Sequence, residues 1–266
     1  MTPLAIEGVA LIGPGFADWA AARAVLAGEI PYAAAPAAVP APLLLPPNER
    51  RRSGLAIKVA LAAGAGALAA CGREAAGIAT VFASSSADGE TCHAICEQLA
   101  GSDRLISPTR FHNSVHNAAA GYWSIATQCR APSTSLCCHD WSFAAGLLDA
   151  ASQVAVDGNP VALIVYDHPY PAPLGVARPI GATFGAALVL APQASPAAIA
   201  LLDIEFEPQK AGATRMDDPG LEALRSGVPA ARCLPLLAAL ARRAREPVIL
   251  EYVAGAHLRM AVTPCA

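Results

Sequence analysis

A junction between a strand and a helix contains Cys137, Cys138, His139 and Asp140. The short strand is expected over residues 134–138, and it runs into an Ala- and Leu-rich helix from about Ser142. At a strand-to-helix turn, unpaired backbone N–H groups and the helix dipole lower the pKa of a thiol and activate it as a nucleophile. An ionised carboxylate also suits the dipole, but it is a poor carbon nucleophile. The segment therefore has the shape of a nucleophile elbow with an aspartate where a cysteine would act.

Asp140 and Cys138 each have a structural and a chemical interpretation. The favoured role of Asp140 is an N-cap, in which its carboxylate accepts hydrogen bonds from the helix that follows, a contribution of about 1 kcal/mol. Cys138 is expected to be an inert packed thiol, because buried cysteines ordinarily are. It becomes the nucleophile only if the strand register slips by two residues, which keeps it on the same face. Trp141 would then crowd the space for a substrate.

Two short patterns could hold a metal ion. Cys92, His93 and Cys96 form one, and His112 with His116, four residues apart, form the other. Neither has the second ligand pair that metal sites with such spacings need. We expect no metal and no cofactor, and we expect the eight cysteines of this chain to be reduced.

Composition excludes several classes of function. The net charge is −3 with a pI near 6.1, and the basic cluster Arg50, Arg51 and Arg52 is short, so nucleic-acid binding is not expected. Mean hydropathy is high at +0.42, yet the most apolar run, residues 59–71, is shorter than the roughly 20 residues that cross a bilayer. The N-terminus lacks the pattern of a signal peptide, which predicts a cytoplasmic protein.

Strand and helix patterns alternate along the chain, which predicts an α/β layered fold with a mixed central sheet and helices on both faces. A single domain over residues 1–266 is expected, with a Pro/Ala-rich surface excursion at 31–47. Residues 183–190 and 200–206 are expected to form a hairpin. The expected strands cover residues 6–15, 78–84, 134–138, 161–166, 183–190, 200–206, 247–253 and 257–262, and the expected helices cover 16–26, 53–71, 90–101, 116–128, 142–156 and 234–245.

Several segments in series carry a family resemblance. Residues 6–15 form a first strand with a Gly/Pro turn, 79–86 a later strand with its loop, and 130–133 read Arg-Ala-Pro-Ser. Residues 131–166 then follow as strand, elbow, helix, Asp-Gly turn and apolar strand. In this order the chain resembles the N-terminal half of β-ketoacyl synthases, which implies a thiolase-like layered fold up to about residue 190.

Residues 107–124, which include Phe-His-Asn-Ser-Val-His-Asn, and residues 46–53 narrow the resemblance further. They look like a short ketosynthase-like subfamily of aryl-polyene pathways, whose half-length members are similar to chain-length factors in pairing with a full ketosynthase. The resemblance implies a cytoplasmic heterodimer in fatty-acid or polyketide biosynthesis. Self-association through the same surface is the other possibility.

Two departures from the family pattern bear on catalysis. Aligned without gaps, the catalytic cysteine of the family falls on Asp140, and the shortened part after about residue 190 lacks the histidines that activate decarboxylation. Condensation needs a thiolate and imidazole donors. The resemblance thus implies a non-catalytic, chain-length-factor-type subunit, in which Asp140 either caps its helix or mimics an acylated or deprotonated partner state. The rival is a cysteine-dependent acyltransferase or thioesterase-like enzyme that uses Cys138 or Cys137, with His139 or His112 as base.

The resemblance also implies where partners bind. In ketosynthases the nucleophile strand and the helix near residue 118 lie at the dimer interface. Arg50, Arg51 and Arg52 are expected at a solvated helix start, and a contact with an acidic acyl carrier protein is the alternative. The residues expected at the partner interface are Phe111, His112, Asn113, His116, Asn117, Tyr122, Trp123, Ser135, Cys137 and His139.

Overall fold

The computed structural model describes residues 3–193, 195–208, 212–253 and 255–265. In this part of the chain one mixed sheet of eight strands runs in the order β3-β2-β4-β5-β1-β6-β8-β7. Strand β2 is parallel to β3 and β4, and the other pairings are antiparallel. The strands are β1 (Leu4–Ile12), β2 (Ala79–Ala83), β3 (Ser133–Leu136), β4 (Val161–Asp167), β5 (Phe184–Pro192), β6 (Ala200–Pro208), β7 (Pro247–Tyr252) and β8 (Ala256–Pro264).

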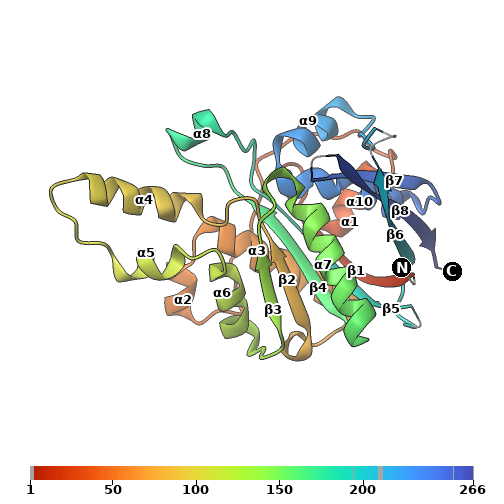
Figure 1. Cartoon of the computed structure of the whole chain (residues 1–266), viewed down its shortest axis with the longest axis horizontal. Coiled ribbons are helices and arrows are strands. Elements are labelled where there is room, and N and C mark those ends of the chain that lie inside the picture. The colour runs from red at the N-terminus through yellow and green to blue at the C-terminus, as the bar shows by residue number, and fades with distance from the viewer. Residues whose placement is uncertain (1–2, 194, 209–211, 254, 266) are drawn as a thin grey trace.

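Helices cover both faces of this sheet (Figure 1). On one face α3 (Leu55–Cys71) and α6 (Ala118–Thr127) share an apolar core with the alternate side chains of β1, β2, β4 and β5. On the other face lie α1 (Trp19–Leu26), α7 (Ser142–Asp157) and α10 (Leu234–Arg242). The expected mixed sheet with helices on both faces is confirmed.

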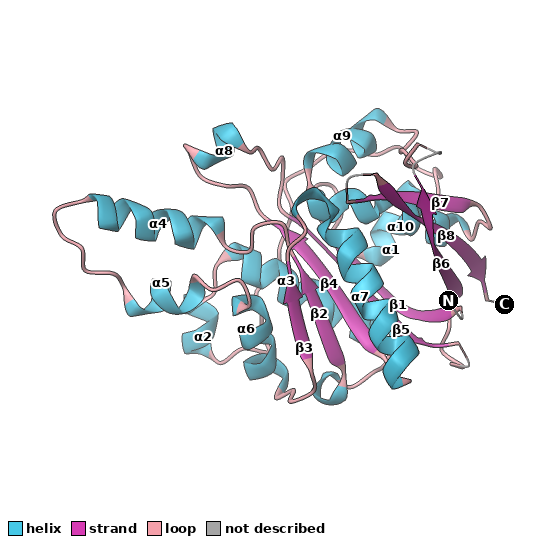
Figure 2. Cartoon of the chain, viewed as in Figure 1, coloured by secondary structure: helices cyan, strands magenta, loops and turns pink. Residues whose placement is uncertain are grey.

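The remaining elements are short or project from the body. Helices α4 (Gly89–Ala100) and α5 (Pro108–Asn113), with the loop between them, form an arm that reaches away from the sheet (Figure 2). No side chain of α4 is buried. The others are α2 (Pro47–Arg52), α8 (Leu174–Ala177), α9 (Pro219–Gly227) and the 3-10 turns η1 (Ala75–Gly77), η2 (His139–Trp141) and η3 (Pro229–Cys233).

Strand β1 and helix α3 approach each other unusually closely. A Cβ on Gly8 would lie 2.1 Å from the carbonyl oxygen of Ala67, so only glycine fits at this crossing. Next to it, at a register shift in β1, the buried Glu7 accepts a hydrogen bond of 2.6 Å from Arg73, just beyond the end of α3. This pairing with Arg73 lowers the pKa of Glu7, although burial opposes it.

The expected hairpin of residues 183–190 and 200–206 is wrong. The two segments do form strands, β5 and β6, but β1 lies between them and pairs with both. Sequence neighbours usually pair, and here the N-terminal strand inserts between them instead. The expected strands at residues 247–253 and 257–262 are confirmed, and as β7 and β8 they form an antiparallel hairpin.

Candidate functional site

The elbow after β3 is a sharp turn. His139 has φ of +51°, a left-handed conformation that is uncommon for a residue other than glycine. Ser142 fixes the start of α7: its Oγ accepts a hydrogen bond from the Cys138 N–H at 3.0 Å and donates one to the His139 carbonyl at 2.8 Å. The serine at the first position of the helix therefore holds the turn together.

Asp140 does not cap the helix, so its predicted N-cap role is wrong. The N-cap residue of α7 is Trp141, and no side chain there accepts a hydrogen bond from the first turn. The Asp140 carboxylate instead meets two guanidinium groups: Arg178 Nη2 is 2.9 Å from Oδ1, and Arg232 Nη2 is 3.3 Å from Oδ2. In each of these bonds both groups are charged, whereas in an N-cap only the carboxylate is.

The arginines connect the elbow to distant parts of the chain. Arg178 follows α8, and Arg232 lies in η3 and also donates to Glu251 of β7. Asp140, Arg232 and Glu251 thus form an alternating chain of charges. The cavity beside them is about 10 Å³, lined also by Trp141 and Phe143, which is room for one water molecule at most. This cavity has no room for an acyl chain.

Neither cysteine of the elbow is activated by a neighbour. Burial raises the pKa of the Cys138 thiol, and Cys137 next to it acts in the same direction. Cys137 is exposed, and its Sγ donates to the carbonyl of Ser85 at 3.2 Å. Among the described residues no histidine forms a hydrogen bond with either sulfur. A thiol without a base within hydrogen-bond reach is a weak nucleophile at neutral pH.

Asp167 anchors the loop below the elbow. It is fully buried at the end of β4 and accepts hydrogen bonds from the Ser85 N–H at 2.9 Å, the Ser85 hydroxyl at 2.8 Å, the Ser84 hydroxyl at 3.2 Å and the Ala230 N–H at 2.7 Å. Burial raises its pKa to about 6, and the hydrogen bonds work against that rise. The loop after β2 and the turn η3 are held in place by one carboxylate.

Several of the predicted interface residues lie on the surface at the β3 end of the sheet. Phe111 is 68% exposed, and His112, Asn117, Cys137 and His139 are exposed as well. His116 and Ser135 are half-buried. Strand β3 pairs with β2 along one edge, and no described strand pairs with its other edge.

The interface prediction is wrong for three residues, because their side chains are buried in the interior of the fold. Trp123 and Tyr122 are each 1% exposed, and Asn113 is 3% exposed. Trp123 packs edge-on to Phe82, while the Tyr122 hydroxyl donates to Asn113 Oδ1 at 3.1 Å. Asn113 in turn donates to the carbonyl of Arg52 at 2.8 Å. These three buried side chains therefore lie beneath the exposed residues of this surface and help to hold them in place.

Arg50, Arg51 and Arg52 lie at the C-terminal end of the separate short helix α2, so their placement at a helix start is wrong. Arg50 donates to the carbonyls of Leu43 and Leu45 at 3.2 and 3.0 Å. Arg52 pairs with Glu49 at 3.0 Å and Arg51 with Asn48, and both arginines are exposed.

The two metal patterns are not assembled into ligand sets. His93 lies 3.3 Å from Glu97, and Cys92 donates to the carbonyl of Ser114. The part of the chain that the structure describes holds no group of three or more His, Cys, Asp or Glu side chains placed for a metal ion.

Among the described residues, no helix has the length and apolar character to cross a membrane.

Comparison with known proteins identifies one matching sequence family and several solved structures with a similar fold. The family described as "Beta-ketoacyl synthase, N-terminal domain" matches residues 19–243. A search of curated proteins finds no match.

The similar solved structures include a ketosynthase (ApeO) in complex with its chain length factor (ApeC) from Xenorhabdus doucetiae. It has a TM-score of 0.75 at 20% identity, with 98% of this chain and 100% of that chain covered. The ishigamide ketosynthase/chain length factor has a TM-score of 0.70 at 16% identity, with both chains fully covered. The type II polyketide synthase complex AntDE:AntF has a TM-score of 0.75 at 10% identity, with 99% of each chain covered. At these identities the likeness establishes a shared thiolase-like fold.

Proposed function

Since the chain belongs to the β-ketoacyl synthase N-terminal domain family, we propose that it is a non-catalytic, chain-length-factor-type subunit that pairs with a full-length β-ketoacyl synthase. The observation that carries the proposal is the elbow, which keeps its turn but holds Asp140 between two arginines beside a cavity of about 10 Å³. Asp140 offers no thiolate to carry an acyl group, and the cavity beside it has no room for one.

The surface at the β3 end supports a partner role. We define the β3-end surface as the free edge of β3, the exposed side of α6, the arm of α4 and α5, and the turn that joins α5 to α6. The large apolar side chains exposed on it are Leu99, Leu105, Phe111, Val115 and Ile125. A free strand edge beside exposed apolar side chains is a surface that proteins normally cover. The free edge of β3 is available to pair with the corresponding strand of a partner.

The partner's chemistry follows from this division of roles. The full ketosynthase would supply the thiolate and the histidines for condensation, and the present subunit would shape or stabilise the acyl tunnel from the β3-end surface. The proposed pair elongates polyene chains held on an acyl carrier protein. The exposed Arg51 and Arg52 would be the contact with that acidic carrier protein, because basic clusters steer acidic partners.

Co-expression with a full-length ketosynthase encoded nearby, followed by size-exclusion chromatography, tests the pairing. We expect the two chains to co-elute. Phe111→Asp should abolish co-elution by placing a charge in an apolar contact. Phe206→Asp is the matched control, because Phe206 is also exposed but lies on β6, which four other strands separate from β3. A stable monomer that never co-elutes would contradict the proposal.

The rival enzyme is tested by mass spectrometry after incubation with acyl-carrier substrates. We expect no acyl adduct on the isolated chain. A covalent adduct on Cys137 or Cys138 would overturn the non-catalytic role and favour a cysteine-dependent acyltransferase.

A further inference from the structure

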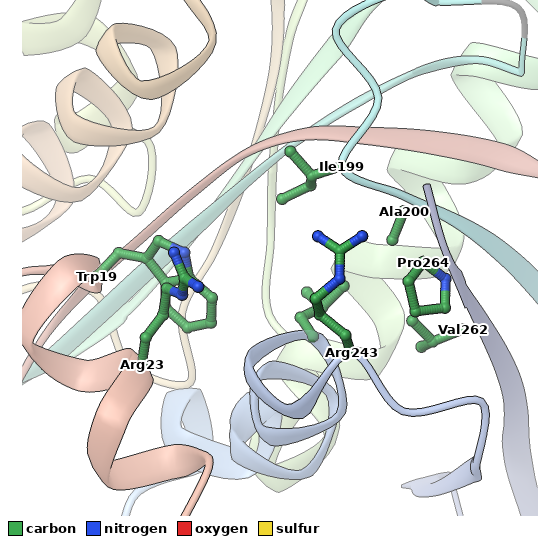
Figure 3. Close-up of a pocket in the computed structure, with 8 residues that line it drawn as sticks. Trp19, Arg23, Ile199, Ala200, Arg243, Val262 and Pro264 are labelled. Carbon is green, nitrogen blue, oxygen red and sulfur yellow. The ribbon is translucent and has the colours of Figure 1, made fainter. Parts of the chain in front are cut away.

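A small pocket lies at the end of the sheet opposite β3. It is formed where α1, the end of α10 and the strands β6 and β8 meet, and its volume is about 140 Å³. Figure 3 shows its lining, with Trp19 and Arg23 on one side and Arg243 facing Ile199 and Ala200 on the other. In the sheet order, β2, β4, β5 and β1 separate β6 from β3. The pocket is thus separate from the elbow and the β3-end surface.

The charges that line the pocket are all positive. The Arg23 side chain makes no hydrogen bond or ion pair with any described residue, and the Arg243 side chain donates to the backbone carbonyl of Cys265. No carboxylate side chain lines the pocket. Other arginines of this chain, such as Arg73, Arg178, Arg225 and Arg232, pair with carboxylates. Two guanidinium groups at one pocket, neither neutralised there, favour an anionic ligand.

The rest of the lining is apolar. Around the two arginines lie the indole of Trp19 and the side chains of Ile199, Leu240, Val262 and Pro264. A cavity of about 150 Å³ is known to accommodate benzene, so a pocket of this size takes one six-membered ring or a short acyl group. An inorganic anion alone would leave this apolar surface unused.

We propose that this pocket binds a small carboxylate with a compact apolar body, about the size of benzoate. Arg23 and Arg243 bind the carboxylate, and Trp19 with its apolar neighbours contacts the body. The site is independent of the proposed pairing with a ketosynthase, because it uses none of the residues of the β3-end surface.

Isothermal titration calorimetry on the full chain tests the site, with benzoate as the probe. We expect one benzoate per chain, and binding about tenfold weaker in Arg23→Gln, since one charge-assisted hydrogen bond is lost. The Arg23 side chain is exposed and has no hydrogen-bond or ion-pair partner among the described residues, so this variant should remain folded. Arg245→Gln makes the same charge change at an exposed arginine outside the pocket and should leave the affinity unchanged.

Two further titrations separate the chemistry. Benzamide, which has the same ring without the charge, should bind at least about tenfold more weakly than benzoate. Inorganic phosphate should also bind more weakly, because it does not use the apolar wall. The proposal is overturned if millimolar benzoate gives no saturable binding, if Arg23→Gln leaves benzoate affinity unchanged, or if benzamide or phosphate matches benzoate.

Discussion

A carboxylate just before a helix has two kinds of partner, the free N–H groups of the first turn and any guanidinium group within reach. Asp140 binds the guanidinium groups of Arg178 and Arg232, because both groups in each of these bonds are charged. The turn does not need the carboxylate as a cap, since Ser142 already orders it. Sequence reasoning found the aspartate and its unusual position. It missed Arg178 and Arg232, which lie 38 and 92 residues downstream and carry no local signal.

Replacing Asp140 by asparagine should lower the free energy of unfolding by about 1 kcal/mol, since two partly exposed ion pairs lose their charge. Urea denaturation at neutral pH measures the change. Asp217→Asn is the matched control, because Asp217 is exposed and has no side-chain partner among the described residues. Equal stability of both variants would show that the arginines do not hold the elbow.

Glu222 gives a pH dependence with a defined sign. The hydrogen bonds from Arg225 lower its pKa to about 2, despite some burial. Because the folded pKa lies below the unfolded value of 4.5, its stabilisation is present above about pH 4.5 and disappears as the pH falls towards 2.

The stability difference between the wild type and Glu222→Gln should therefore be about 1–2 kcal/mol near pH 6 and vanish near pH 2. Unfolding curves across this range measure it. Glu246→Gln, which alters an exposed pair 3.9 Å from Arg242, should show almost no pH-dependent difference. A flat profile for the Glu222 variant would contradict the assignment.

At the scale of elements, local patterns identified most helices and strands but not their neighbours. Helix α9 was missed, although Asp218 as N-cap, Pro219 at the first helical position and Glu222 in the first turn give a recognisable start. The order β5-β1-β6 had no such signal, because strand pairing across the whole chain depends on long-range packing. Asn113, Tyr122 and Trp123 lie in a motif that resembles a family interface, yet burial places them beneath it.

Gly8→Ala should destabilise the fold by about 1–3 kcal/mol, because the new methyl group would overlap the backbone oxygen of Ala67 and force β1 away from α3. Thermal and urea unfolding measure the loss. Gly77→Ala is the control, since a Cβ there meets no atom within 4 Å. If the two variants are equally stable, the close approach of β1 and α3 does not restrict residue 8.

At the scale of the whole molecule, the two ends of the sheet differ. The β7 end is packed by α7 and α10, whereas the β3 end carries the arm, whose helix α4 contributes no buried side chain. Few contacts with the body predict a low free energy of local opening for the arm.

Trypsin should therefore cut first after Arg104, which is exposed in the loop between α4 and α5. Limited proteolysis followed by mass spectrometry locates the cut. Arg104→Gln should slow that cleavage, and a bound ketosynthase should protect the site if it covers the β3-end surface. First cleavage in the sheet would show that the arm is not the least stable element.

The junction between β1 and β6 sets how the molecule opens. β1 pairs with β5 along nearly all its length, but with β6 only through Leu4, Ala5 and Ile6. Beyond those residues, β6, β8 and β7 pair with one another, so their amide hydrogens should exchange with solvent as one unit, ahead of those in β4 and β5. Each such opening would move Glu251 away from Arg232, which would then hold Asp140 less firmly. The order of the elbow thus depends on how often strands on the far side of the sheet open, a frequency that hydrogen exchange measures.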